Sequence, residues 1–208
     1  GKERGRNCLV FFDSSLDNDA QRRVRMTSLL RIDTDRNGFS FVAQPKVNGQ
    51  GQLVGSELLM RWSTEAFGNV SPVEFIPVAE ESGQIRELGN WTLEAACQQL
   101  SRWKSMGRHP GSVAVNLSAS HFRDQRLPDQ LSHLIEAYGV APGELTIELT
   151  ESTVMADSEA SMKTIQALRA LGVALAVDDF GTGYSSLAYL KLLRPQKLKI
   201  DRSFVRDV

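Results

Sequence analysis

Apolar residues recur with two different periods along residues 38–208, and each period indicates a different kind of element. Short apolar or alternating runs are typical of strands, and segments with apolar residues every three or four positions are typical of amphipathic helices. The expected strands are FSFVAQPKV, LVGSELLMRW, SVAVN, ELTIELT, VALAVDD and QKLKID. The longer helices are expected over 87–106, 128–138, 159–171 and 185–193. Repeated strand–helix alternation predicts an α/β fold with a mainly parallel sheet, either open or closed into a barrel.

Capping residues and glycines indicate where the helices begin and end. A short helix is expected to follow Ser71, with Ser71 as the N-cap, Pro72 at the first helical position and Glu74 at the capping-box position. We expect this helix to end at Gly83. The next helix, over 87–106, has an apolar side that is expected to face the core. That side consists of Trp91, Ala95, Cys97, Leu100 and Trp103.

The first 37 residues have a different pattern. Residues 1–14 are basic and then apolar, without a periodicity long enough for a paired element, and they are expected to end an upstream module. Residues 15–37 place Val24, Leu29 and Leu30 on a mostly charged segment. This pattern predicts a connecting helix whose charged face is solvated. The main domain is expected to follow this helix.

Composition narrows the classes of function. The chain has 208 residues, 41% of them hydrophobic and 24% charged, which excludes disordered and fibrous classes. A net charge of −1 gives no general attraction to nucleic acid polymers. No apolar run approaches the ~18 residues that cross a bilayer, so no membrane contact of this segment is expected. Cys8 and Cys97 are too far apart for a CxxC pattern, which favours a reducing cytoplasm. His121 and His133 are expected at ordinary surface positions.

Polar side chains stand at the carboxyl ends of most of the expected strands. In parallel α/β folds, ligands bind beyond these ends. Because side chains alternate along a strand, the small or polar positions share one face and the bulky aliphatic positions share the other. The residues at these ends are Glu57, Asn116, Glu148, Asp178, Asp179 and Lys199. We therefore expect them to meet at one rim, as at the mouth of a barrel.

The residue types at this rim predict a metal centre. Converging carboxylates repel one another unless a cation neutralises them. Oxygen ligands, including the amide of Asn116, favour Mg²⁺, Mn²⁺ or Ca²⁺ over zinc or copper. The adjacent Asp178 and Asp179 would let one carboxylate bridge two ions for in-line attack on phosphorus, with Lys199 orienting water or countering phosphate charge. For each single acid, the alternative is a helix N-cap in a strand–helix loop.

Seven segments follow the pattern of the EAL domain family, in the family's order. They are QPKV at 44–47, GSELLMRW at 55–62, SPVEFIPVAEESG at 71–83, VNLSASHF at 115–122, ELTIELTES at 144–152, DDFGTGYSSLAYL at 178–190 and LKIDRSFV at 198–205. The chain resembles this family over most of residues 38–208, with Leu58 in place of the alanine of the signature triplet. The resemblance implies a modified TIM (β/α)8 barrel that hydrolyses cyclic di-GMP to linear pGpG with Mg²⁺ or Mn²⁺.

The resemblance also assigns roles to individual residues. The implied ligands of a two-metal site, in which Ca²⁺ would be an inhibitory occupant, are Glu57, Asn116, Glu148, Asp178 and Asp179. Lys199 matches a catalytic residue near the attacking water. Glu151 matches the residue that holds the loop after Asp179 and couples to dimerisation, so a homodimer is the implied assembly. The positions that match contacts to the dinucleotide are Gln44, Leu58 and Arg61.

Both ends of the chain bear on its organisation. The opening GKERGRN, followed by an aromatic pair, resembles the tail of a GGDEF domain, which implies an upstream GGDEF-like module in the same polypeptide. Past the KID strand, the family adds two strand–helix units, which supply a glutamate taken as general base and a glutamine that contacts substrate. We therefore expect an unclosed barrel with exposed strand edges, and weak binding and slow hydrolysis by these 208 residues alone. A full-length protein can also carry a membrane anchor elsewhere.

Three interpretations of the function remain open at this point. The first is a phosphodiesterase that hydrolyses cyclic di-GMP in second-messenger signalling. The second is a catalytically inactive cyclic di-GMP receptor that regulates a partner through the GGDEF–EAL junction. Retention of all the metal-ligand positions favours the hydrolase, because a receptor has no need of them. A third reading is a different metal-dependent barrel that acts on phosphates.

Overall fold

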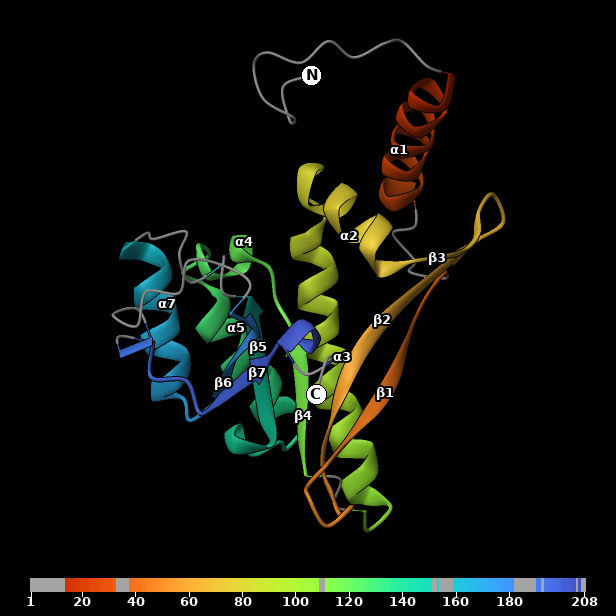
Figure 1. The fold of residues 1–208 in the computed structure, drawn as a ribbon. Coiled ribbons are helices and arrows are strands. Elements are labelled where there is room, and N and C mark those ends of the chain that lie inside the picture. The colour runs from red at the N-terminus through yellow and green to blue at the C-terminus, as the bar shows by residue number, and fades with distance from the viewer. Residues whose placement is uncertain are drawn as a thin grey trace.

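The computed structural model shows the predicted alternation of strands and helices (Figure 1). It describes residues 14–32, 38–108, 111–150, 153, 159–181, 190–191, 193–204 and 206. The described helices are α1 (Ser14–Ile32), α2 (Pro72–Glu81), α3 (Ile85–Ser105), α4 (Ala119–Phe122), α5 (Leu127–Ala137) and α7 (Glu159–Ala170), with 3₁₀ turns η1 (Pro142–Glu144) and η2 (Arg202–Phe204). The described strands are β1 (Phe39–Val47), β2 (Leu53–Thr64), β3 (Gly68–Val70), β4 (Ser112–Asn116), β5 (Leu145–Thr150), β6 (Ala174–Phe180) and β7 (Lys197–Ile200).

The predicted element boundaries agree with the structure to within a few residues. The helix expected over 87–106 is α3, which begins two residues earlier, at Ile85. Most of the helix expected over 185–193 lies outside the described residues, as do residues 1–13 with most of the GGDEF-like tail. Among the described helices, none is both long enough and apolar enough to cross a lipid bilayer.

The strands form one sheet in the order β1-β2-β4-β5-β6-β7, with β3 paired to β2. The β1–β2 pair is an antiparallel hairpin, and the pairs from β2 to β7 are parallel, which confirms a mainly parallel sheet. Among the described strands, β1 and β7 are the two edges. Leu198 and Ile200 on β7 are 47% and 63% exposed. Exposed apolar residues on an edge strand are a surface to which a further strand can add.

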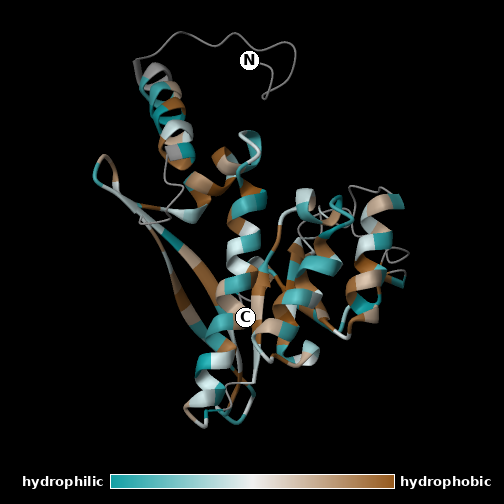
Figure 2. Cartoon of the chain, turned by 180° about the vertical axis from the view of Figure 1, so that it is seen from behind, coloured by the Kyte–Doolittle hydropathy of each residue, from teal (hydrophilic) through white to brown (hydrophobic). Residues whose placement is uncertain are grey.

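Helices α3, α5 and α7 cover one face of the sheet. The aliphatic residues of the central strands point toward this face, for example Val113 and Val115 on β4 and Ile147 on β5, each fully buried. Figure 2 shows the central strands as largely apolar and the helices as mixed, with apolar and polar positions on different sides. The main core therefore lies between the helices and one face of the sheet, which leaves the small and polar positions on the other face.

The buried side of α3 confirms the predicted one in part. Cys97 and Leu100 are buried as predicted, whereas Trp91, Ala95 and Trp103 are only partly buried. Leu93 and Ala96, which the prediction omits, are fully buried in the same core as Cys97 and Leu100.

A second core forms around the N-terminal helix. Met26 and Leu30 of α1 are buried with Trp62 and Phe75, whereas Val24, which the sequence placed in the apolar set, is 68% exposed. The charged side of α1 is not simply solvated, because Arg22 and Arg23 pair with acidic residues of α2. Figure 1 shows α1 leaning against α2. The predicted connecting helix is therefore docked on the domain.

The start of α2 confirms the predicted position of the helix and its proline, but not the two predicted capping interactions. Pro72 occupies the first helical position after Ser71, but the Ser71 side chain makes no capping hydrogen bond. Glu74 is not engaged in a capping box, because its carboxylate pairs with the guanidinium of Arg22 on α1. Tertiary contact with α1 has replaced the local contact that the sequence suggested.

His121 is not the surface residue that the sequence suggested. It is 3% exposed, and both of its ring nitrogens have partners. Nδ1 lies 2.9 Å from the hydroxyl of Ser118, and Nε2 lies 3.2 Å from the backbone carbonyl of Arg86. Burial lowers the pKa of His121 below its ordinary value, although the hydrogen bonds oppose this effect. The charged groups that act on the ring are Arg86, which lowers the pKa, and Asp124, which raises it.

The depressed pKa of His121 predicts a loss of stability in acid. A histidine whose folded-state pKa lies below its unfolded value of about 6.5 stabilises the fold fully above that pH, and this contribution is lost as the pH falls toward the folded-state pKa. We expect the free energy of unfolding, measured with urea, to fall between pH 7.5 and pH 5. The His121→Gln variant should lose less stability over this range, and His133→Gln, at an exposed histidine, should behave like the unaltered chain. Equal pH responses in all three proteins would contradict the prediction.

Candidate metal centre

The register of the sheet brings the predicted polar residues to one place. Gln44 lies opposite Glu57 in the β1–β2 hairpin, so both side chains are on the same face. Across the parallel strands, Asn116 is level with Glu148 and Thr150 is level with Asp178. Alternation then gives Glu148 and Asp178 the same face as Glu57. This is the face opposite the helices, near the carboxyl ends of β4, β5 and β6, as the sequence predicts. Glu57 differs from the prediction, because it lies within β2 (Leu53–Thr64) and not at the end of that strand.

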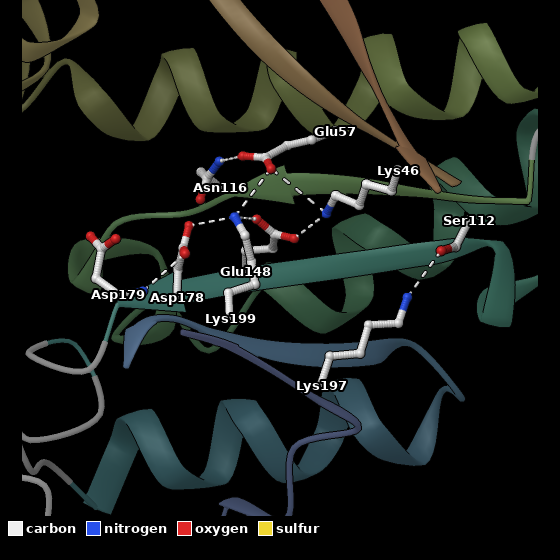
Figure 3. A network of polar contacts seen from close by, with 9 residues as sticks. All are labelled: Lys46, Glu57, Ser112, Asn116, Glu148, Asp178, Asp179, Lys197 and Lys199. Carbon is white, nitrogen blue, oxygen red and sulfur yellow. Dashed lines mark hydrogen bonds and ion pairs between the residues drawn. The ribbon is translucent and has the colours of Figure 1, made fainter. Parts of the chain in front are cut away.

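Three carboxylates surround one ammonium group in this site (Figure 3). Lys199 Nζ lies 2.6 Å from Glu148 Oε2, 2.6 Å from Asp178 Oδ2 and 3.1 Å from Glu57 Oε2. Each of these three acids offers an oxygen within 4.8 Å of the others. Burial works to lower the pKa of Lys199, but its hydrogen bonds and the nearby negative charges hold the pKa above its ordinary value. Lys199 is therefore a fixed positive charge at the centre of the acids.

Glu148 is the most deeply placed of the acids, with a side chain that is 1% exposed. A buried carboxylate needs partners on both oxygens to offset its lost hydration. Lys199 binds one oxygen, and Lys46 Nζ lies 2.5 Å from the other, Oε1. Lys46 Nζ also lies 3.7 Å from Glu57 Oε2. Lys46 is not among the predicted site residues, although strand alternation puts it on the same face as Gln44.

Asn116 fixes the orientation of Glu57. Its side-chain Nδ2 donates to Glu57 Oε1 at 2.7 Å, and Lys199 holds the other oxygen. Burial raises the pKa of Glu57, but the hydrogen bonds from Asn116 and Lys199 and the charges of the two lysines outweigh it, so the pKa lies below its ordinary value. Glu57 is therefore held as an anion in a single orientation.

Asp179 stands beside the cluster and points away from it in Figure 3. Its backbone has a φ of 53°, in the left-handed region that aspartate tolerates better than most residues. Its backbone N–H donates to Asp178 Oδ1 at 2.9 Å. Burial raises the pKa of Asp179, and the negative charges of Asp178 and Asp201 raise it further. The structure thus places Asp179 next to the three clustered acids, and its role as a ligand stays a prediction.

The remaining predicted residues fall in different surroundings. Gln44 is exposed on the face that carries the acids, and alternation on β2 gives Arg61 the same face. Leu58 is 5% exposed and packs in the main core, on the helix side of β2. Glu151 lies outside the described residues. The structure therefore brings together Glu57, Asn116, Glu148, Asp178 and Lys199, and leaves the dinucleotide contacts as predictions.

The donor set fits a hard divalent cation. It consists of three carboxylates with one amide alongside, and contains no histidine or cysteine, which matches the oxygen preference of Mg²⁺ and Mn²⁺. The three carboxylates already share one cationic group, Lys199 Nζ, which shows that their oxygens can converge on a single positive charge. Three carboxylates against the two ammonium groups of Lys46 and Lys199 leave a negative balance that favours a further cation.

A family model described as EAL domain matches residues 27–208. The bifunctional diguanylate cyclase/cyclic di-GMP phosphodiesterase MucR of Pseudomonas aeruginosa is 40% identical over 208 residues, which is 100% of this chain and 30% of that protein. A cyclic di-GMP phosphodiesterase of the same organism is 37% identical over 199 residues, which is 95% of this chain and 34% of that protein. This chain thus spans about a third of the length of these relatives.

Solved structures agree with the sequence match. A MucR phosphodiesterase in complex with c-di-GMP superposes with a TM-score of 0.82 at 40% identity, over 88% of this chain and 74% of that one. The FimX EAL domain of Xanthomonas citri, in complex with c-di-GMP, superposes with a TM-score of 0.79 at 26% identity, over 92% and 74%. These likenesses confirm the predicted TIM-barrel-like α/β fold. The chain belongs to the EAL domain family.

Proposed function

We propose that this chain is the catalytic domain of a cytoplasmic cyclic di-GMP phosphodiesterase, which forms linear pGpG with Mg²⁺ or Mn²⁺. The observation that carries the proposal is the convergence of Glu57, Glu148 and Asp178 on one cationic group at the carboxyl ends of parallel strands. The family match supports it, as do relatives named as cyclic di-GMP phosphodiesterases and a relative's structure in complex with c-di-GMP.

The polar residues of the site have separate tasks in this proposal. Glu57, Glu148 and Asp178 hold the metal, with Asp179 beside them, and Asn116 keeps Glu57 in place. Bound divalent cations would supply Lewis-acid activation of water and neutralise charge on the phosphodiester. Lys199 presents a permanent positive charge that stabilises negative charge as it develops on the phosphate.

Hydrolysis with a defined product tests the proposal. Cyclic di-GMP is incubated with Mg²⁺ and the protein, and linear pGpG is quantified by chromatography. The assay is run with this chain and with a longer chain that includes the two further strand–helix units implied by the family. We expect metal-dependent formation of pGpG by the longer chain and complete inhibition by a chelator. Release of GMP, or hydrolysis that persists after the metal is removed, would contradict the proposal.

The receptor alternative predicts a different result in the same assay. A receptor would bind cyclic di-GMP without forming pGpG in either chain, and its affinity would not depend on Mg²⁺. The clustered acids argue against this reading, because a site that only binds an anionic dinucleotide gains nothing from three carboxylates. An upstream GGDEF-like module and a homodimer remain part of the proposal, to be examined in the full-length protein.

A further inference from the structure

The loop after β4 links the metal site to a buried histidine. Asn116 is the last residue of β4, and its amide reaches the carboxylate of Glu57. Two residues later, Ser118 precedes α4, which carries His121. Asn116, Ser118 and His121 line the same cavity of about 100 Å³ beneath β2 and α3. The histidine is therefore close to the site without belonging to the cluster of acids.

The partners of His121 define one tautomer. A backbone carbonyl can only accept, so Nε2 must carry the proton and donate to the carbonyl of Arg86 at 3.2 Å. In the neutral ring Nδ1 is then an acceptor, and the hydroxyl of Ser118 donates to it at 2.9 Å. Ser120 lies 2.7 Å from Ser118 Oγ, and its hydroxyl can donate to that oxygen. The chain of hydrogen bonds thus runs in one direction, from Ser120 through Ser118 and His121 to α3.

The surroundings hold the imidazole ring in this position. A Cβ atom at Gly89 would lie 1.9 Å from His121 Nε2, so α3 accommodates the ring only because residue 89 is glycine. On the other side of the loop, the backbone N–H of Leu117 donates to the backbone carbonyl of Glu148 at 3.0 Å. The segment that follows Asn116 is therefore fixed to β5 through Leu117 and to α3 through Ser118 and His121.

We propose that His121 is a positioning residue for the metal centre: through Ser118 it holds the loop that presents Asn116 to Glu57. The inference rests on the proposed metal-dependent function, because that function makes Asn116 and Glu57 residues of the metal site. Groups that orient metal ligands from outside the ligand set commonly affect metal affinity by about 10–100-fold. His121 acts one step further out, through Ser118, so its loss should weaken binding by several-fold rather than abolish it.

The test compares variants of His121 by direct Mn²⁺ binding, followed by electron paramagnetic resonance without substrate. In His121→Gln, the amide can accept from Ser118 and donate to the carbonyl of Arg86, so Mn²⁺ affinity should stay within about twofold of the unaltered chain. His121→Leu loses both bonds and should weaken Mn²⁺ binding by about 5–10-fold. Ser118→Ala removes the hydrogen bond between Ser118 and His121 but keeps the buried ring. This variant should weaken Mn²⁺ binding by a similar factor, even if His121→Leu folds poorly.

A control separates positioning from general stability. Leu131→Ala in α5 removes a fully buried side chain from the main core without removing a hydrogen bond of Ser118 or His121, and should lower stability without changing Mn²⁺ affinity. Mn²⁺ affinity in His121→Leu and Ser118→Ala equal to that of the unaltered chain would overturn the inference, and so would a loss in His121→Gln as large as in His121→Leu. A failure of the proposed function would give a different result: the unaltered chain would bind Mn²⁺ but would not hydrolyse cyclic di-GMP.

Discussion

Replacing Glu57 by glutamine should reduce Mg²⁺-dependent hydrolysis of cyclic di-GMP by on the order of 10³-fold or more, with the fold retained. Loss of a group that merely supports a metal ligand costs about 10–100-fold, so loss of a ligand's charge should cost more. Glutamine has nearly the same shape as glutamate, but its single carbonyl oxygen can accept from only one of the two donors, Asn116 on Oε1 or Lys199 on Oε2. The variant therefore removes one negative charge and one hydrogen-bond acceptor from the site, with little change in side-chain shape.

The measurement is initial-rate formation of pGpG at saturating Mg²⁺, together with the thermal midpoint of unfolding. The matched control is Glu65→Gln, which makes the same chemical change in the exposed turn between β2 and β3 and should leave the rate within about twofold. A Glu57→Gln rate within tenfold of the unaltered chain would show that this carboxylate is not needed, and the metal-site assignment would fail with it.

The second large effect is on stability. Trp62→Ala should lower the free energy of unfolding by about 3–5 kcal/mol, the range for removing a large aromatic from a core. Trp62 is 1% exposed and stacks on Phe39 at 5.4 Å between ring centroids, with an edge contact to Phe75 at 5.6 Å. This core joins α1 and α2 to the hairpin that carries Glu57, so its loss should loosen all three.

Urea unfolding of two further variants shows how much of the expected loss of stability comes from the burial of Trp62 and how much from its indole N–H. Trp103→Ala makes the same truncation on α3 at a partly buried position and should cost clearly less. Trp62→Phe keeps the ring stacking and removes an indole N–H that is buried without a partner in the described structure, so it should cost little. A Trp62→Ala loss no larger than that of Trp103→Ala would mean that the second core does not stabilise this domain.

The hydrophobic pattern predicted the α/β fold and the carboxyl-end location of the site because both depend on periodicity alone. A period of two determines which strand residues share a face, so Glu148 and Asp178 could be assigned to one side without coordinates. The residue types at strand ends, oxygen donors without histidine or cysteine, then predicted the class of metal. The resemblance to the EAL domain family, which rests on seven motifs in the family's order, added an expected substrate class. The match of the family model confirms the membership in this family.

Other features depend on contacts between segments distant in sequence, where periodicity gives no information. Lys46 and Glu148 are 102 residues apart, and only the pairing of β1 with β2 brings the lysine to the acid. The sequence predicts a surface position for His121, yet the ring is buried under α3, where the glycine at position 89 makes room for it. The docking of α1 likewise depends on arginines that meet acids of α2.

The order and type of the elements, the face of each strand residue and the oxygen character of the site are local properties of the chain, so the amino-acid sequence predicts them without coordinates. The pairing of charges, the burial of polar residues and the direction in which Asp179 points are visible only in the folded protein. Burial and ion pairing depend on neighbours in space. Those neighbours come together only when the sheet and the helices pack, so a pattern along the sequence does not predict them.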